Sequence, residues 1–215
     1  MTRDSLTELL RPREFEDLFQ PTAMVGSLRR MVSEKTLSNM LFYGSPGIGK
    51  TSAAKILIHK LGNNCYEING SAETGRETVK DIDKAASSCG LFDGPRVIFI
   101  DEADFLSNAT QAALRGTIER NRHCRFILTA NDIRRFHPAL KSRCIPICFD
   151  VRQTEVDGII TRLLPRVVKN LKPVGLEIEE KRIRELFYRY FPDVRAAVGR
   201  IEIEAKTLED VGNGK

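Results

Sequence analysis

The residues with the clearest chemistry lie in one short stretch that fits the phosphate-binding pattern G-x-x-x-x-G-K-[ST]. The stretch is Gly44-Ser45-Pro46-Gly47-Ile48-Gly49-Lys50-Thr51. Its glycines let the backbone curl so that successive N–H groups point at phosphate oxygens, and a helix beginning here adds its positive dipole end. Lys50 is expected to reach the β- and γ-phosphates, and the Thr51 hydroxyl to bind Mg²⁺. The alternative is a chance glycine turn with a surface lysine.

Two carboxylates and an amide follow apolar runs farther along the chain. Asp101 and Glu102 come directly after Val97-Ile98-Phe99-Ile100. Asp101 can hold Mg²⁺ directly or through water, and Glu102 is free to orient or deprotonate an attacking water. Asn131 ends the next predicted strand, where it can hold that water against the γ-phosphate. The alternatives are a solvated acidic turn and a turn-capping asparagine.

Two arginines stand where a guanidinium can stabilise a phosphoryl group during its transfer. Arg143 lies just before the last predicted strand, in Lys141-Ser142-Arg143-Cys144. This strand is expected to lie far along the sheet from the phosphate loop, so Arg143 is expected to serve a neighbouring subunit's nucleotide. Arg195 begins the last predicted helix and can reach back to the γ-phosphate of its own chain. A solvated surface charge is the alternative for Arg143.

A basic stripe is predicted on one helix of the first part of the chain. Arg76, Lys80 and Lys84 are spaced i, i+4, i+8 and share one side, whereas the apolar residues of the same helix form a separate core face. Contact with phosphate groups of a nucleic acid is the functional interpretation. A solvated helix face is the alternative, because acidic residues dilute the stripe.

These residues need a scaffold of alternating strands and helices. Apolar runs predict strands at 40–43, 66–69, 97–100, 125–130 and 145–149. The main helices are predicted at 23–35, 52–61 and 110–120. Another helix is predicted to begin in the loop around Gly75 and to run to about Ser87. This alternation predicts a doubly wound α/β fold with a parallel sheet, whose ligands sit beyond the carboxyl ends of the strands. The proline in the fifth strand favours a sheet edge.

The character of the chain changes after Asp150. Helical spacing without any predicted strand indicates a small helical domain over 151–215, packed on an α/β domain over 1–150. Pro165 is expected to kink the first of these helices. Residues 1–23 are predicted to be an irregular lead.

Composition restricts the functional class without selecting one. The 215 residues carry a net charge of +5, which permits contact with nucleic acid without requiring it. No apolar stretch is long enough for a membrane span, and the charged N-terminus does not resemble a secretory signal. A cytoplasmic protein is therefore expected. Five cysteines without a C-x-x-C pair are typical of free thiols in a reducing compartment.

Taken together, the motifs resemble those of the clamp-loader ATPases of the AAA+ superfamily, in particular replication factor C small subunits and the large clamp-loader subunit of T4-like phages. The resemblance covers nearly the whole chain. The matching motifs are the Leu10-Arg11-Pro12 lead, the Walker A motif Gly44 to Thr51, the Walker B motif Asp101-Glu102-Ala103-Asp104, sensor 1 Thr129-Ala130-Asn131, the arginine-finger motif Ser142-Arg143-Cys144 and sensor 2 Pro192-Asp193-Val194-Arg195. Pro192 replaces the glycine of the usual sensor 2, and Gly116 replaces a second arginine after Arg115.

The resemblance implies an ATPase with Mg²⁺ that works in a ring with other clamp-loader subunits, opens a sliding clamp and grips primer–template DNA. It places Arg11, Pro12 and Ser52 among the ATP-binding residues, Lys80 and Lys84 on the DNA backbone, and Leu91-Phe92 against the clamp. It also makes Asn69 a restraint on Glu102. Relatives continue into a helical collar domain, so a chain ending at Lys215 is expected to be a truncated or unusually short member. The rival hypotheses are a subunit that binds ATP without hydrolysing it and an ATP-driven protein remodeller without a DNA role.

Overall fold

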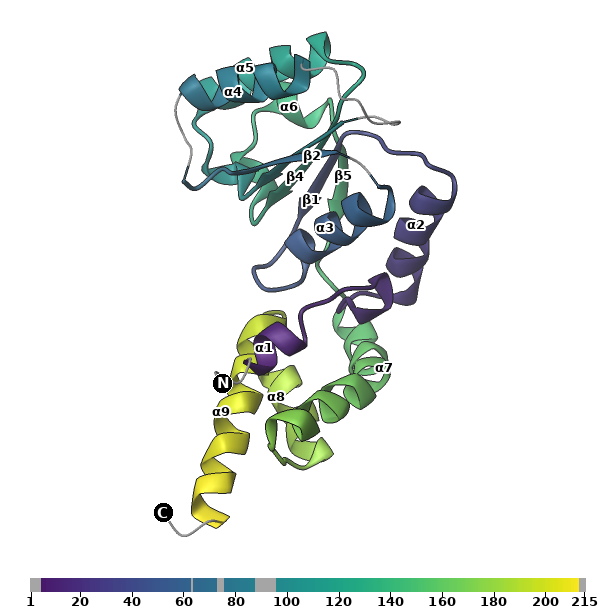
Figure 1. The fold of residues 1–215 in the computed structure, drawn as a ribbon, viewed down its shortest axis with the longest axis vertical. Helices are drawn as coiled ribbons and strands as arrows, with labels where there is room; N and C mark the ends of the chain where they lie inside the picture. Colours follow the sequence, from purple (N-terminus) through teal and green to yellow (C-terminus); the bar gives the residue numbers. More distant parts are fainter. Residues whose placement is uncertain (1–4, 63, 73–75, 88–95, 213–215) are drawn as a thin grey trace.

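The computed structural model describes residues 5–62, 64–72, 76–87 and 96–212, arranged in two lobes (Figure 1). One lobe contains a five-stranded parallel sheet in the order β2-β3-β4-β1-β5. The strands are β1 Met40–Tyr43, β2 Cys65–Asn69, β3 Val97–Asp101, β4 Arg125–Ala130 and β5 Ile145–Cys148. The structure therefore confirms the predicted doubly wound α/β fold.

The fifth strand lies at the edge of the sheet, beside β1. The Ile145 N–H donates to the Asn39 carbonyl just before β1, and the Phe149 N–H donates to the Tyr43 carbonyl of β1. Backbone N–H groups alternate in direction along a strand, so the backbone nitrogen of residue 146 faces away from β1. Pro146 has no N–H to offer there, and an edge strand tolerates it for that reason.

Helices cover both faces of the sheet (Figure 1). The first face carries α2 Thr22–Ser33 and α3 Lys50–Lys60, and the second carries α4 Arg76–Ser87, α5 Asn108–Arg120 and α6 Pro138–Lys141. Strand β1 shows why both faces are apolar: Met40 and Phe42 pack into one core cluster and Leu41 into the other. Alternate side chains of a strand point to opposite faces, so a strand covered on both sides reads as a continuous apolar run.

The second lobe is helical and contains both termini of the described chain (Figure 1). Its helices are α7 Gln153–Leu171, α8 Glu180–Tyr190 and α9 Val194–Gly212, and a short 3-10 turn follows α7 at Lys172–Val174. The sheet lobe has two further 3-10 turns, at Ala103–Phe105 and Ile133–Arg135. Helix α7 continues through Pro165. The buried apolar side chains of these helices belong to the same core cluster as Met40 and Phe42 of β1 and the buried apolar side chains of α3.

The N-terminal segment differs from the irregular lead that the sequence predicted. It forms helix α1, Leu6–Leu9, and a 3-10 turn at Phe15–Asp17, and α1 packs against α7 and α9 of the helical lobe. Ser5 accepts the Glu8 N–H at 3.3 Å, and the Leu6 N–H donates to Glu202 of α9 at 2.9 Å. One turn of helix is unstable alone and shows no periodicity, so only its docking on α9 makes it form.

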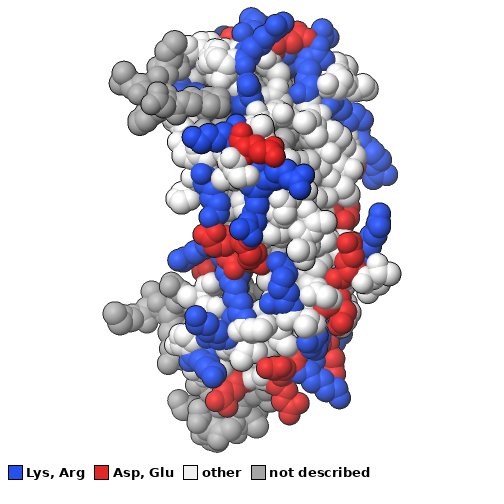
Figure 2. Space-filling view, turned by 90° about the vertical axis from the view of Figure 1, so that its right-hand side faces the viewer, with Lys and Arg blue, Asp and Glu red and all other residues white. Residues whose placement is uncertain are grey.

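Charges of both signs occur over the face seen in Figure 2, with Lys and Arg more frequent over its upper part. This matches the modest net charge of +5. Within the described residues, no helix combines the length and the apolar character that crossing a lipid bilayer requires.

Candidate active site

A cavity at the junction of the two lobes collects most of the residues that the sequence singled out. Its walls come from the phosphate loop, the carboxyl ends of β3 and β4, the N-terminal segment and helices α7, α8 and α9. The sequence-predicted residues that line it are Arg11, Pro12, Pro46, Gly47, Ile48, Gly49, Lys50, Thr51, Ser52, Asp101, Glu102, Asn131 and Arg195. Gly44 and Ser45 form the start of the same loop.

The phosphate loop depends on backbone conformations that favour glycine. Gly47 and Gly49 have φ values of 71° and 100°. Gly47 is also pressed against the helical lobe, because a Cβ placed on it would lie 1.9 Å from Oδ1 of Asp193. The same Asp193 oxygen accepts the Ala196 N–H at 2.9 Å and so caps α9. The loop and the first turn of α9 therefore pack together without room for a side chain.

Lys50 is buried, with 7% of its surface exposed, and all three of its ammonium hydrogens have acceptors. Its Nζ donates to the carbonyls of Gly44 at 2.7 Å and Ser45 at 2.8 Å, and to Oδ1 of Asn131 at 2.9 Å. Burial lowers the pKa of this lysine, while the carboxylates of Asp104, Asp150 and Asp101 act in the opposite direction. A buried cation held only by neutral oxygens is suited to exchange them for phosphate oxygens.

Thr51 and Asp101 provide the donor set that a magnesium ion prefers. Thr51 Oγ1 donates to Asp101 Oδ1 at 2.8 Å, which puts a hydroxyl and a carboxylate side by side where α3 begins and β3 ends. Thr129 of β4 donates to the same carboxylate oxygen. Hard oxygen ligands next to a phosphate loop fit Mg²⁺, which binds few protein groups together with substrate phosphates. Among the described residues, Thr51 and Asp101 would hold it.

Glu102 has an unusual backbone for a residue other than glycine. Its φ and ψ are 53° and 40°, in the left-handed region, which costs about 1–3 kcal/mol. Its N–H donates to Thr129 Oγ1 at 3.0 Å, and Gly70 of the neighbouring loop packs so closely that a Cβ there would lie 2.7 Å from the Glu102 carbonyl oxygen. These contacts fix the direction in which the Glu102 side chain leaves the strand.

Asn131 is held from two sides. Its side chain accepts from Lys50, and its N–H donates to Oδ2 of the buried Asp104 at 3.2 Å, as does the Asp132 N–H at 3.3 Å. Sequence reasoning gave Asp104 no role beyond its place in the matching motif. By contrast, the side-chain oxygen of Asn69 accepts from the Ser71 N–H and hydroxyl, at 3.0 and 2.8 Å. The expected restraint of Glu102 by Asn69 has no hydrogen bond behind it among the described residues.

Arg195 projects from the start of α9 into the cavity and is exposed. Within the described part of the chain it forms no hydrogen bond or ion pair, but its charge contributes to the lowered pKa of Lys50. The like charges of Arg195 and Lys50 repel each other. A triphosphate between them would relieve that repulsion.

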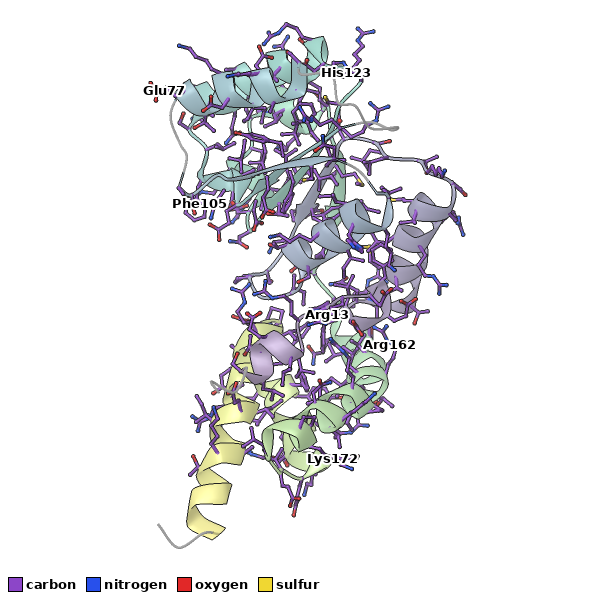
Figure 3. The ribbon with its side chains drawn as sticks, in the orientation of Figure 1. Arg13, Glu77, Phe105, His123, Arg162 and Lys172 are labelled. Carbon is purple, nitrogen blue, oxygen red and sulfur yellow. The ribbon has the colours of Figure 1, made fainter. Side chains whose placement is uncertain are left out.

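The N-terminal segment is tied to the helical lobe by two arginines that sequence reasoning missed. Arg166 donates to the carbonyls of Leu10 and Arg11, each at 3.1 Å, and pairs with Asp17 at 3.1 Å. Arg162 lies at the junction of the lobes (Figure 3) and donates to carbonyls of the same segment, including that of Gln20 at 2.7 Å. The i, i+4 spacing of these arginines on α7 was the only signal, and it is shared by many solvated helices.

The apolar side of the cavity was also outside the sequence prediction. It includes Leu10 and Phe19 from the N-terminal segment and Leu163, Val167 and Phe187 from the helical lobe. The rings of Phe19 and Phe187 stack with centroids 5.9 Å apart. The cavity therefore has a polar end at the phosphate loop and an apolar end, as a nucleotide with its flat base requires.

Arg143 is absent from this cavity. Its Nε donates to Glu119 Oε1 of α5 at 2.8 Å, its Nη2 bonds the same oxygen, and its Nη1 donates to the Ala139 carbonyl at 2.5 Å. The neighbouring β5 begins at Ile145, opposite the start of β1 at Met40, whereas the phosphate loop follows the end of β1. The expectation that β5 lies far along the sheet from the phosphate loop is wrong, because β5 is the direct neighbour of β1. Arg143 is separated from the phosphate loop by the length of the strands, since the two lie at opposite ends of the sheet.

The residues expected to contact DNA and the clamp lie elsewhere. Lys80 and Lys84 are exposed on α4, and the Asp83 carboxylate between them accepts from Arg120 of α5 and from Asn121, which caps that helix, both at 3.1 Å. Arg76 begins α4. Leu91 and Phe92 lie outside the described residues. Glu77, at the start of the same helix, is labelled in Figure 3 on the outer side of the sheet lobe.

Solved structures with the same fold include a branch migration motor. The RuvB Holliday junction branch migration motor of Thermotoga maritima matches with a TM-score of 0.71 at 20% identity, over 95% of this chain and 68% of that one. A threonine-to-valine variant of the same RuvB matches with the same TM-score and coverage. At this identity the likeness concerns the fold alone.

Sequence relatives are more similar. The replication factor C small subunit of Methanocella arvoryzae is 33% identical over 98% of this chain and 66% of its own length. Replication factor C subunit 3 of Oryza sativa is 31% identical over 91% of this chain and 55% of its own. The chain thus spans about two thirds or less of the curated relatives it matches. Residues 40–150 match the family described as "ATPase family associated with various cellular activities (AAA)". Together with the site geometry, this match shows that the chain belongs to the AAA family of ATPases.

Proposed function

We propose that this chain is the ATPase module of a DNA sliding-clamp loader, which uses ATP binding and hydrolysis to open a clamp and load it on primer–template DNA. In this proposal residues 1–150 form the ATPase domain and 151–215 form a helical lid. Its partners are other clamp-loader subunits, the clamp and the DNA. Such a role would place it in the cytoplasm, or in the nucleus of a eukaryote.

The observation that carries the proposal is the convergence of separate motifs on one cavity. The phosphate loop, the Asp101–Glu102 pair, Asn131 and Arg195 come from four different elements and meet at the junction of the lobes. Similarity to replication factor C small subunits over most of the chain directs this ATPase site toward clamp loading.

Binding begins with exchange of partners at Lys50. The two loop carbonyls and Asn131 that now accept from its ammonium group would give way to β- and γ-phosphate oxygens, which bear full charge. The loop amides and the start of α3 add their dipoles to the same position. The apolar end of the cavity, with Phe19 and Leu163, would cover the base.

Hydrolysis needs a water molecule held in line and relieved of a proton. Release from Lys50 frees the Asn131 side chain to hold that water, and Glu102 accepts its proton. Thr51 and Asp101 would hold magnesium, which would supply positive charge beside the phosphates. Arg195 reaches the γ-phosphate from the lid, which links the phosphate state to lid position.

The test is hydrolysis by the chain together with clamp-loader partners and the clamp from its own source, with and without primer–template DNA. We expect turnover to be stimulated by clamp and DNA together. Stimulation by an unfolded protein but not by clamp or DNA would instead establish a protein remodeller. Tight ATP binding without turnover in any assembly would establish a structural ATP-binding subunit.

A further inference from the structure

Thr129 occupies a position that joins the two carboxylates of the site. It is the fifth residue of β4, is 1% exposed, and follows Leu128, which pairs with Ile100 of β3. Ile127 packs in the core cluster on the α3 side, whereas Phe126 and Leu128 pack on the other. Alternation along the strand therefore turns the Thr129 side chain toward α3 and the phosphate loop.

The hydroxyl of Thr129 uses its bonding capacity in two directions at once. It donates to Asp101 Oδ1, the oxygen that also accepts from Thr51 at 2.8 Å. It accepts the Glu102 N–H at 3.0 Å. One hydroxyl group has a single hydrogen to donate and can accept as well, so both functions are used within the described site.

Each of these bonds acts on a different part of the chemistry. The bond to Asp101 leaves Oδ1 with two donors, which fixes the rotation of the carboxylate beside the Thr51 hydroxyl. The bond from Glu102 holds the peptide group at the point where the backbone enters the left-handed region, with φ 53°. The direction of the Glu102 carboxylate depends on that backbone conformation.

We infer that Thr129 is a positioning residue for ATP hydrolysis: its hydroxyl sets the orientation of Asp101 toward the magnesium position and of Glu102 toward the attacking water. The inference rests on the proposed ATPase function. It assigns the hydroxyl, and not the threonine methyl group, as the active feature. A strand position beside a buried neighbour needs only a β-branched side chain for packing, which valine supplies equally well.

The test compares Thr129→Val, which keeps the shape and removes the hydroxyl, with Thr129→Ser, which keeps the hydroxyl. Thr117→Val is the matched control, because Thr117 is also fully buried but lies in α5, where its hydroxyl accepts only from Arg120 at 3.3 Å among the bonds described. Binding of a fluorescent ATP analogue without Mg²⁺ reports whether each variant is folded and holds nucleotide. The Mg²⁺ dependence of that binding and the turnover by the full chain are then measured.

We expect Thr129→Val to bind the analogue normally without Mg²⁺, to need ~5-fold more Mg²⁺ for half-maximal enhancement of binding, and to lose ~10-fold or more in kcat with little change in KM, the pattern of a lost transition-state contact. Thr129→Ser should recover most of both losses, and Thr117→Val should behave as wild type. Equal defects in the valine and serine variants, or a valine variant with normal Mg²⁺ dependence, would overturn the inference. If wild type does not hydrolyse ATP, the proposed function fails, but the Mg²⁺ titration still decides the role of Thr129 toward Asp101.

Discussion

The carboxyl end of the parallel sheet and its amino end hold their charged groups in different ways. At the carboxyl end, Lys50 and Asp101 are bonded within a cavity that the helical lobe closes. At the amino end, the side chain of Arg143 is 26% exposed and pairs with Glu119, away from that cavity. The first end gathers in one cavity of one chain the residues that we propose bind phosphate. The second holds Arg143 apart from that cavity, which is consistent with the proposal that it acts on the nucleotide of a neighbouring subunit.

The largest effect is expected at the amino end, in an assembled complex. Arg143→Ala should leave ATP affinity and basal turnover of the isolated chain nearly unchanged. In a full clamp loader it should reduce turnover by ~10³-fold or more, the usual effect of removing an arginine finger supplied in trans. The measurement is steady-state hydrolysis of the two preparations side by side.

Arg115→Ala is the matched control, because Arg115 also contacts Glu119, at 3.4 Å, from within α5. It should have little effect in either preparation. Mixing decides the geometry: an Arg143→Ala subunit should regain turnover next to a neighbour whose Arg143 is intact. A loss of activity in the isolated chain would show that Arg143 acts on its own nucleotide.

The next effect is expected at the carboxyl end, where two variants should separate binding from chemistry. Glu102→Gln removes the proton acceptor and should lower turnover by ~10²- to 10⁴-fold, with ATP affinity retained. Lys50→Ala removes the cation between the phosphates and should gravely weaken binding itself. Equilibrium binding and single-turnover hydrolysis are the measurements. Equal loss of binding in both variants would contradict the separate roles.

A moderate effect is expected on α4, which belongs to neither end. Lys80→Ala combined with Lys84→Ala should weaken DNA binding by the assembled loader without sequence preference. The slope of log K against log salt should decrease by about one to two units. Lys169→Ala combined with Lys172→Ala removes the same charge from the helical lobe and serves as control. If the slope is unchanged, or changes equally in the control, the α4 stripe is a solvated face.

The smallest effect concerns the pair that holds Arg143 and depends on pH. The hydrogen bond from Arg143 lowers the pKa of the Glu119 carboxyl below its usual range. A lowered folded-state pKa contributes stability above the unfolded value of about 4.3, and that contribution disappears as pH falls through the folded-state value. Wild type should therefore melt slightly above Glu119→Gln at pH 7 and at the same temperature in strong acid. A difference that grows toward low pH would contradict the assignment.

The three inner strands β1, β3 and β4 were predictable because they are buried on both faces and read as apolar runs, as Val97 to Ile100 shows. The phosphate loop was predictable because only glycine takes the conformations of Gly47 and Gly49 without strain. Helix α1 was not, since a single turn carries no periodicity and depends on Glu202, which is 196 positions away from Leu6. Sequence reasoning assigned Thr129 no role beyond its place in a matching motif. Its hydrogen bonds to Asp101 and Glu102 became visible only in the structure.

The sequence by itself therefore determined the chemistry at the phosphate loop and the order of strands and helices, because both follow from local residue types and spacing. Only the tertiary structure decided how the parts meet. It put the helical lobe against Gly47 through Asp193, tied the N-terminal segment to α7 through Arg162 and Arg166, and left Arg143 at the opposite end of β5 from the loop. The physical reason is the range of the interactions. Backbone conformation and strand burial depend on residue types that are close in the sequence. A hydrogen bond between distant segments forms only after the chain has packed.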